Sequence, residues 1–329
     1  MRARRTQVLA VLGLCVAVSI AVVSGCSSAN GSSSGAATVA ARTNPAVQPI
    51  DSLPGTDVTQ SGDGTGDLRE VDFYSKALGR ADSYLIYLPP NYRSMASSGT
   101  RFPVVYMLHG DGNHGARSAS HLFESGKVGA TASGLYASGQ LKPTLIVVPN
   151  LAGQDSDGDT EWANTQRGRY EAALLQMVHS VDMTWPTIAK RSGRGISGLS
   201  MGGYGAVNVG LRHLNLFSTI ESWSGYFNQT PTGPYVGASR KLLRATSPAV
   251  YVRRMRGPLA KHQIQVLLYV SPTEGFAGEQ APFAKTLRSL GVSVKTKVFP
   301  GDHDFDLWAS HMGLALKFAD RHLTPAGRG

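Results

Sequence analysis

The chain has 329 residues, of which 42% are hydrophobic and 16% are charged. This composition supplies an apolar core and excludes intrinsic disorder for the bulk of the chain. The 32 Lys and Arg residues against 22 Asp and Glu residues give a formal net charge of +10. Because the chain has no long basic run and no basic patch interleaved with aromatics, we treat this excess as scattered. We exclude nucleic acid as a partner and expect a weak attraction to anionic surfaces.

The N-terminal segment predicts export. Basic residues within 1–5 precede an apolar stretch at 8–23, the pattern of a signal peptide. The tetrapeptide Val-Ser-Gly-Cys that ends at Cys26 resembles a bacterial lipobox, in which the signal is cut before a cysteine that is then diacylated. We expect Cys26 to carry a lipid anchor that holds the protein at the cell membrane, outside the cytoplasm. An uncleaved membrane-spanning anchor and secretion into the medium are the alternatives.

Four segments follow from composition. Residues 1–25 are the expected lipoprotein signal peptide, and 26–66, dominated by small and polar residues, are expected to form a flexible tether. Residues 67–324 have the pattern of one folded domain and 325–329 that of a short tail. Both cysteines, Cys15 and Cys26, precede that domain, so it has no disulfide framework and no cysteine-based metal site.

Short apolar runs alternate with longer helical patterns through the domain. The runs that predict strands lie at 68–74, 83–88, 103–108, 144–148, 194–199, 217–223, 263–270 and 292–299. The segments that predict helices lie at 127–138, 170–182, 201–213, 281–290 and 307–322. We expect the first two strands to pair antiparallel and the others to form a mainly parallel buried sheet. The alternation predicts an α/β fold in three layers.

A nucleophile motif occurs at a predicted junction between strand and helix. Gly198, Ser200 and Gly202 form the pattern Gly-x-Ser-x-Gly, in which the serine projects from a sharp turn above the sheet. The glycines are needed because the backbones of the strand and the helix approach too closely for a β-carbon. Ser200 is therefore the candidate nucleophile, and the nearby Ser197 is a serine without that arrangement.

A serine nucleophile needs a histidine as general base, and His303 has the position expected of one. It follows the predicted strand 292–299 directly, and sites in such folds form beyond the carboxyl ends of the strands. Two other histidines between Ser200 and His303, namely His213 and His262, are expected at the end of the sheet opposite the carboxyl ends of the strands. His311 and His322 belong to the last predicted helix and fit better as surface or packing residues.

The acid that orients the base is expected in the loop after the strand 263–270. Glu274 is the first candidate, and Glu279 is the second. Glu279 falls in the early turn of the next helix, where a carboxylate favours the helix dipole without any catalytic role. The aspartates that flank His303 receive less weight, because neighbouring loop residues seldom point a carboxylate at each other's rings.

The oxyanion of an acyl-transfer intermediate requires backbone N–H donors. One donor is expected from Met201, the residue after the nucleophile. The other is expected from the loop after the strand 103–108, where Asp111 follows Gly110. An ordinary tight turn is the alternative interpretation of that loop.

With these residues placed, the chain resembles a known family over 68–322. The most specific segments are YMLHG at 106–110, GLSMGGYGA at 198–206, and PGDHDF at 300–305 followed by Trp308. They resemble the putative esterase (esterase D-like) family of α/β-hydrolases, which includes feruloyl and enterobactin esterases, S-formylglutathione hydrolases and mycolyltransferases. The resemblance implies an α/β-hydrolase fold. One departure is that SPTE stands at 271–274, where many members carry Gly-Thr-x-Asp.

The resemblance maps the family's triad to Ser200, Glu274 and His303, and its oxyanion donors to Asp111 and Met201. It implies a serine carboxylic-ester hydrolase that works through an acyl-serine intermediate on a small-molecule or glycolipid ester. Acyl transfer to a cell-envelope sugar would use the same intermediate. We expect no cofactor and no metal. The alternative is a non-catalytic surface protein that keeps the fold to bind wall glycan or a host ligand.

The acidic run at 155–159 and most of the large aromatic residues are expected to be structural. The run lacks the spacing of a calcium loop and is expected to be an acidic surface loop. The aromatic residues Trp162, Trp223 and Tyr226 are expected in the core, whereas Trp308, close to His303, has a place in the site. We expect the segments 136–140 and 228–249 to shape the acyl and acceptor pockets.

Overall fold

The computed structural model describes residues 53–58, 66–112, 117–152 and 158–328. The chain divides into two units, Met1–Asn44 and Pro45–Gly329, and every described residue belongs to the second. Cys26 and the predicted signal peptide lie outside the described residues, so their assignment stays a prediction. In the described ranges, no helix is both long enough and apolar enough to cross a bilayer.

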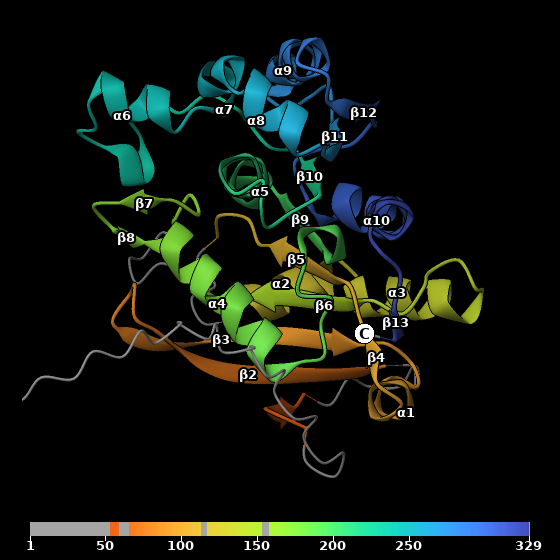
Figure 1. The fold of residues 1–329 in the computed structure, drawn as a ribbon. Helices are drawn as coiled ribbons and strands as arrows, with labels where there is room; N and C mark the ends of the chain where they lie inside the picture. Colours follow the sequence, from red (N-terminus) through yellow and green to blue (C-terminus); the bar gives the residue numbers. More distant parts are fainter. Residues whose placement is uncertain (1–52, 59–65, 113–116, 153–157, 329) are drawn as a thin grey trace, which may run out of the picture. The chain divides into compact units, whose positions relative to one another are not determined.

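A sheet of nine strands, in the order β1-β2-β3-β6-β5-β9-β10-β11-β12, forms the centre of the fold (Figure 1). The bounds are β1 Thr56–Asp57, β2 Asp67–Ser75, β3 Arg80–Leu88, β5 Val104–Leu108, β6 Leu145–Pro149, β9 Arg194–Leu199, β10 Thr219–Trp223, β11 Gln265–Val270 and β12 Ser293–Val298. The pairs from β1 through β3 to β6 are antiparallel, and all pairs from β6 to β12 are parallel. The predicted antiparallel opening and mainly parallel sheet are confirmed.

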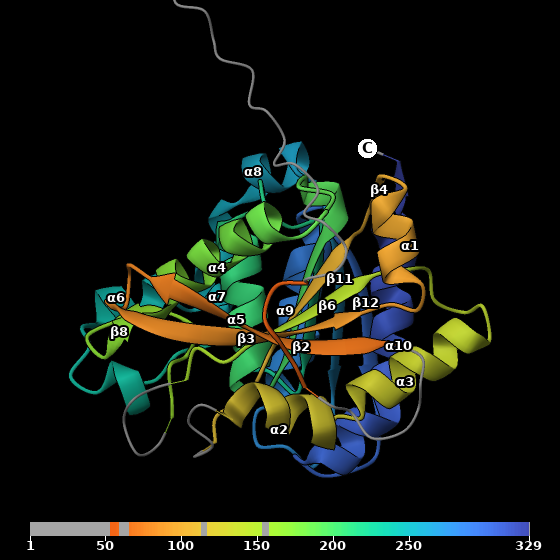
Figure 2. The same cartoon turned by 90° about the horizontal axis from the view of Figure 1, so that it is seen from below.

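Helices cover both faces of this sheet (Figure 2). The longer helices are α2 Ser118–Ser125, α3 Val128–Ala137, α4 Tyr170–Thr184, α5 Met201–Arg212, α9 Ala277–Ser289 and α10 Phe305–His322. The apolar side chains of α4, α5 and α9 share one buried cluster, and those of α2, α3 and α10 share another. The sheet lies between these clusters, so the three-layer α/β prediction is confirmed.

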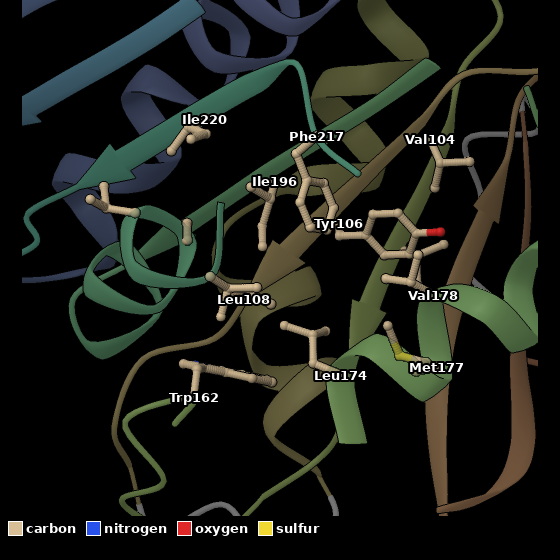
Figure 3. Close-up of a cluster of buried hydrophobic side chains, with 14 of the residues drawn as sticks. Val104, Tyr106, Leu108, Trp162, Leu174, Met177, Val178, Ile196, Phe217 and Ile220 are labelled. Atoms are coloured by element: carbon tan, nitrogen blue, oxygen red, sulfur yellow. The ribbon is translucent and has the colours of Figure 1, made fainter. Parts of the chain in front are cut away.

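The strand β5 contributes apolar side chains to the buried clusters on both faces of the sheet. Val104, Tyr106 and Leu108 belong to the cluster under α4 and α5, while Val105 and Met107 belong to the other cluster. Alternate residues of a strand point to opposite faces, and a strand buried on both faces is therefore apolar throughout. Figure 3 shows Tyr106 and Leu108 in one cluster with Leu174 and Met177 of α4.

Shorter elements complete the domain. They are α1 Tyr92–Ser97, α6 Arg240–Ala245, α7 Pro248–Tyr251, α8 Arg256–Lys261, β4 Thr100–Arg101, β7 Asn164–Thr165, β8 Gly168–Arg169, β13 Gly327–Arg328 and the 3-10 helices η2 Arg191–Gly193, η3 Gly233–Tyr235 and η4 Val252–Arg254. The sequence did not predict them, because elements of two to six residues carry too little periodicity. The helix α9 begins at Ala277 rather than at 281, so Pro282 lies inside the helix, beyond its first turn.

The predicted tether and tail differ from the structure at their domain ends. β1, inside the predicted tether, pairs with β2, and β13, inside the predicted tail, pairs with β4. The buried guanidinium of Arg69 donates to the carbonyl oxygens of Leu53, Pro54 and Gly55 and pairs with Asp57. The domain therefore starts before residue 67, because one long-range arginine secures a segment whose composition alone resembles a spacer.

Candidate active site

Ser200 stands on a strained turn between β9 and α5. Its backbone has φ 56° and ψ −122°, an unusual conformation for a residue other than glycine. The turn is held by the Ser200 N–H, which donates to the carbonyl of Trp223 at 2.8 Å. A β-carbon at Gly198 would overlap the Gly202 carbonyl, and one at Gly202 would overlap the Leu108 carbonyl. The predicted reason for both glycines, crowding of strand and helix backbones, is confirmed.

His303 lies in the loop between β12 and α10, with its ring beside the serine. The distance from His303 Nε2 to Ser200 Oγ is 2.8 Å. Phe276 and Trp308 meet the imidazole edge to face, with ring centroids 5.3 Å and 5.0 Å away. The indole N–H of Trp308 donates to Ser224 Oγ at 3.0 Å. These contacts fix the ring orientation, so the interpretation of Trp308 as part of the site agrees with its position.

Glu274 lies on the other side of the same imidazole. Its Oε1 is 3.3 Å from His303 Nδ1, and its side chain is only 1% exposed. The second carboxylate oxygen accepts the Ser271 N–H at 3.3 Å. The Thr273 and Ser271 hydroxyls both donate to the Gly301 carbonyl. The loops that carry the acid and the histidine are therefore joined directly, and the distance between carboxylate and ring depends on that junction.

The competing residues have other partners. Glu279 Oε2 accepts the Phe227 N–H at 2.7 Å and the Asn228 amide at 2.9 Å. His213 contacts Glu171 at 2.8 Å, and the ring of His311 stacks on Phe299 at 3.6 Å. Of the two glutamates considered, only Glu274 is brought to His303.

The two segments expected to carry the oxyanion donors both lie next to Ser200. Met201 opens α5 directly after Ser200. A β-carbon at Gly110 would lie 3.3 Å from the Ser200 β-carbon, so the loop that leads to Asp111 passes against the nucleophile. The His109 ring, 2.8 Å from the Asn150 carbonyl, and the Trp162 indole, which donates to the His109 carbonyl at 3.1 Å, hold this loop.

A pocket of about 310 Å³ opens at Ser200 and His303. One wall is the loop at 109–111, and the opposite wall contains Phe305 and Trp308. The remaining wall comes from Ser118, His121 and Leu122 of α2, which the sequence did not lead us to expect. The sequence signal that could have indicated this wall is the amphipathic pattern of residues 118–125, shortly after the oxyanion loop.

The expectation for residues 136–140 differs from the structure. Tyr136 is stacked on Tyr87 and donates to the Thr144 carbonyl at 2.9 Å. No residue of 136–140 lines the pocket at Ser200. The end of α3 therefore serves packing, because the Tyr136 hydroxyl finds its partner inside the domain rather than at the site.

Glu161 is a second residue that the sequence did not single out. Its carboxylate accepts the Tyr226 hydroxyl at 2.5 Å and the Gln229 amide at 2.8 Å. Burial and, to a smaller extent, the charges of Asp159 and Asp111 together raise the pKa of Glu161 to about 8, although its hydrogen bonds with Tyr226 and Gln229 act in the opposite direction. The Glu161 N–H donates to Met201 Sδ at 3.3 Å. The backbone of this buried glutamate thus contacts the side chain of the residue that follows the nucleophile.

The acidic run at 155–159 lies mostly outside the described residues. Where the structure is described, no set of three or more His, Cys, Asp or Glu side chains has an arrangement suited to a metal ion. Trp162 and Trp223 are fully buried, as expected of core residues, and Tyr226 is partly buried against Tyr204.

The parallel sheet with helices on both faces, and the serine raised on the β9–α5 turn, define an α/β-hydrolase. The model of the family described as "Putative esterase" matches residues 75–318. The chain therefore belongs to the putative esterase family, and its domain is that of a serine esterase.

Comparisons with curated proteins agree. A Xylanibacter ruminicola protein named endo-1,4-beta-xylanase/feruloyl esterase is 26% identical over 172 residues, which cover 52% of this chain and 22% of that protein. An esterase of Mycobacterium tuberculosis is 27% identical over 155 residues, which cover 46% of this chain and 31% of the relative. The matched region thus spans less than a third of the length of either relative.

Solved structures share the fold. A ferulic acid esterase superimposes with a TM-score of 0.68 at 23% identity, covering 79% of this chain and 99% of the other. An S-formylglutathione hydrolase from Agrobacterium tumefaciens superimposes with a TM-score of 0.65 at 16% identity, covering 82% and 99%. At these identities the likeness establishes the α/β-hydrolase fold.

Proposed function

We propose that the chain is an exported serine carboxylic-ester hydrolase whose triad is Ser200, His303 and Glu274. The observation that carries the proposal is the continuous run of contacts from the serine hydroxyl through both ring nitrogens to a buried carboxylate, at 2.8 Å and 3.3 Å. In this arrangement Ser200 is the nucleophile, His303 is the base and Glu274 is the acid that orients the base.

The mechanism follows from these positions. His303 Nε2 takes the proton of the Ser200 hydroxyl as Oγ attacks the ester carbonyl carbon, and the Met201 and Asp111 N–H groups bind the oxyanion. The intermediate collapses, the alcohol leaves with the proton from His303, and an acyl-Ser200 remains. His303 then deprotonates a water that attacks this ester, and it returns the proton to Ser200 Oγ as the bond to the acyl carbon breaks and the acid is released. Glu274 stabilises the imidazolium in both steps.

The pocket supports an ester with an apolar or aromatic acyl part. Leu122, Phe305 and Trp308 provide apolar walls within about 310 Å³, and the named relatives include a feruloyl esterase. The substrate is a small-molecule or glycolipid ester. If a sugar hydroxyl replaces water in the second step, the same enzyme transfers the acyl group to a cell-envelope sugar. Esters of graded acyl length, with and without trehalose or arabinose, test both points.

The activity itself is tested with a fluorophosphonate probe and a short-chain p-nitrophenyl ester. Wild type should be labelled and should turn over the ester, whereas Ser200→Ala should do neither. Equal labelling of both proteins contradicts the nucleophile assignment. No ester hydrolysis by wild type, together with saturable binding to cell wall, favours the non-catalytic alternative.

The location is proposed from the sequence alone, since Cys26 lies outside the described residues. A diacylated Cys26 supplies enough buried methylenes for stable attachment to the cell membrane. Cys26→Ala should move the protein from the detergent phase to the aqueous phase in a Triton X-114 partition and should block fatty-acid incorporation. Wild type found wholly in the medium would instead indicate secretion.

A further inference from the structure

The positive charge of the chain is concentrated in two segments rather than scattered as predicted. Residues 240–261 contain Arg240, Lys241, Arg244, Arg253, Arg254, Arg256 and Lys261, and no Asp or Glu. Three more arginines lie within residues 1–5. These ten residues account for the whole excess, because the rest of the chain has 22 basic and 22 acidic residues.

The segment 240–261 forms one exposed part of the domain. It comprises α6, α7, η4 and α8, and all seven basic side chains are exposed. Figure 1 shows α7 and α8 between α6 and α9. Among the described residues, none of the seven has a carboxylate within 4.0 Å. Exposed cations without acidic partners keep their full charge for an external ligand.

Three of the arginines converge on a hollow of about 570 Å³. Arg244 comes from α6, Arg253 and Arg254 come from η4, and the opposite wall is α9. We call this feature the cationic hollow. The apolar residues Ala249, Val250, Pro282 and Phe283 also line it, and we call them its apolar floor. Its one acidic lining residue, Glu279, accepts the Phe227 N–H and the Asn228 amide through Oε2, and its single negative charge is outweighed by the three arginines.

We propose that the cationic hollow binds the phosphate group of an anionic lipid and so holds the domain against the membrane surface. Guanidinium groups present several donors to one phosphate, and three of them surround this hollow. The apolar floor suits the glycerol and first methylenes of a lipid better than a wholly polar ligand. A concave site with exposed basic residues around it also matches the negative surface potential of a membrane.

The hollow lies close to the catalytic residues along α9. Phe276, just before the helix, contacts the His303 ring, and Gly278 and Glu279 of its first turn line the hollow. A domain seated on lipid through the hollow therefore keeps His303 near the membrane surface. Lipid binding itself requires no catalysis, so it can be tested on Ser200→Ala protein as well as on wild type.

The test is co-sedimentation of the full chain with vesicles of phosphatidylcholine containing about 30% phosphatidylglycerol, compared with phosphatidylcholine alone. Each basic residue near such a surface contributes about fivefold, so removal of three positive charges should lose about 100-fold of the preference for anionic vesicles. The triple variant Arg244→Glu/Arg253→Glu/Arg254→Glu, which also adds three negative charges, should lose at least that much. The apolar N-terminal segment is common to all variants, so its contribution to vesicle binding cancels when binding to anionic vesicles is divided by binding to phosphatidylcholine alone. The corresponding triple Arg→Gln variant provides a second comparison that introduces no new charge.

The matched control is Lys76→Glu/Lys190→Glu/Arg321→Glu, which changes the net charge equally at exposed sites outside 240–261. It should retain most of the preference. A second experiment titrates glycerol phosphate, a soluble anion, into the same proteins. If wild type shows no preference for anionic vesicles, the lipid assignment is overturned, even if the arginines bind glycerol phosphate or an acidic polysaccharide. Equal losses in the hollow and control variants overturn it as well.

Discussion

The catalytic pocket and the cationic hollow are built on opposite physical principles. At the pocket, Glu274 is buried and contacts a histidine held between two aromatic rings. At the hollow, three exposed arginines from short helices surround an apolar floor. Chemistry requires groups whose geometry is set before the substrate arrives, whereas attraction of an anionic surface requires only accessible charge. Substitutions should therefore affect turnover at the first and salt-dependent binding at the second.

The largest effect is expected from the serine and histidine. Ser200→Ala and His303→Ala should each lower kcat by about 10³-fold or more, because the nucleophile and its base act as one unit. For the same reason the double variant should be little worse than either single variant. Steady-state hydrolysis of a p-nitrophenyl ester measures this.

Ser197→Ala is the matched control for the serine. Its hydroxyl is fully buried and donates to the Tyr106 carbonyl at 3.4 Å, away from the pocket. Ser197→Ala should keep most of the activity. A loss comparable to that of Ser200→Ala would contradict the choice of nucleophile.

A smaller loss is expected at the acid. Glu274→Gln keeps the shape of the side chain but removes the charge that stabilises the imidazolium, so kcat/KM should fall by roughly 10²-fold or more while KM changes little. Glu279→Gln, which leaves the His303 contacts intact, should retain activity. The reverse order of the two variants would assign the acid to Glu279.

Vesicle binding at the hollow and turnover at the pocket should respond differently to salt. Raising ionic strength from about 0.05 M to about 0.5 M shortens the Debye length severalfold. The preference for anionic vesicles should therefore fall by at least about tenfold, while kcat on a neutral soluble ester stays nearly constant. Vesicle binding and ester hydrolysis measured on one preparation make the comparison. A parallel loss of both would show that the regions are not independent.

The smallest effect concerns stability at Glu161. Its pKa is raised to about 8, so between pH 4.5 and 8 the folded chain binds more protons than the unfolded chain. The unfolding free energy should therefore fall as pH rises through this window, by up to a few kcal/mol for this group. Glu161→Gln should make that fall shallower. Urea denaturation at pH 5 and pH 8 measures the difference, and the exposed Glu124→Gln should leave the slope unchanged.

Local chemistry explains what could be predicted from the sequence. The β9–α5 turn was recognisable because the overlap that excludes a β-carbon involves glycines two residues from Ser200. The strands were recognisable because a strand buried on both faces, such as β5, is a continuous run of apolar residues. The positions of His303 and Glu274 followed from the rule that sites form beyond the carboxyl ends of parallel strands. Each inference used only neighbouring residues or the order of the strands.

Tertiary structure alone decided the rest. Three features join segments distant in the chain: the α2 wall of the pocket, the Glu161 N–H that donates to Met201, and the Arg69 contacts that secure β1. The seven basic residues could be counted from the sequence, but short helices give no periodicity to show that three of them surround one hollow. Sequence determines which groups are present and which backbone turns are possible. Long-range packing determines which of those groups meet and which lose contact with water, and a pKa or a binding site depends on both.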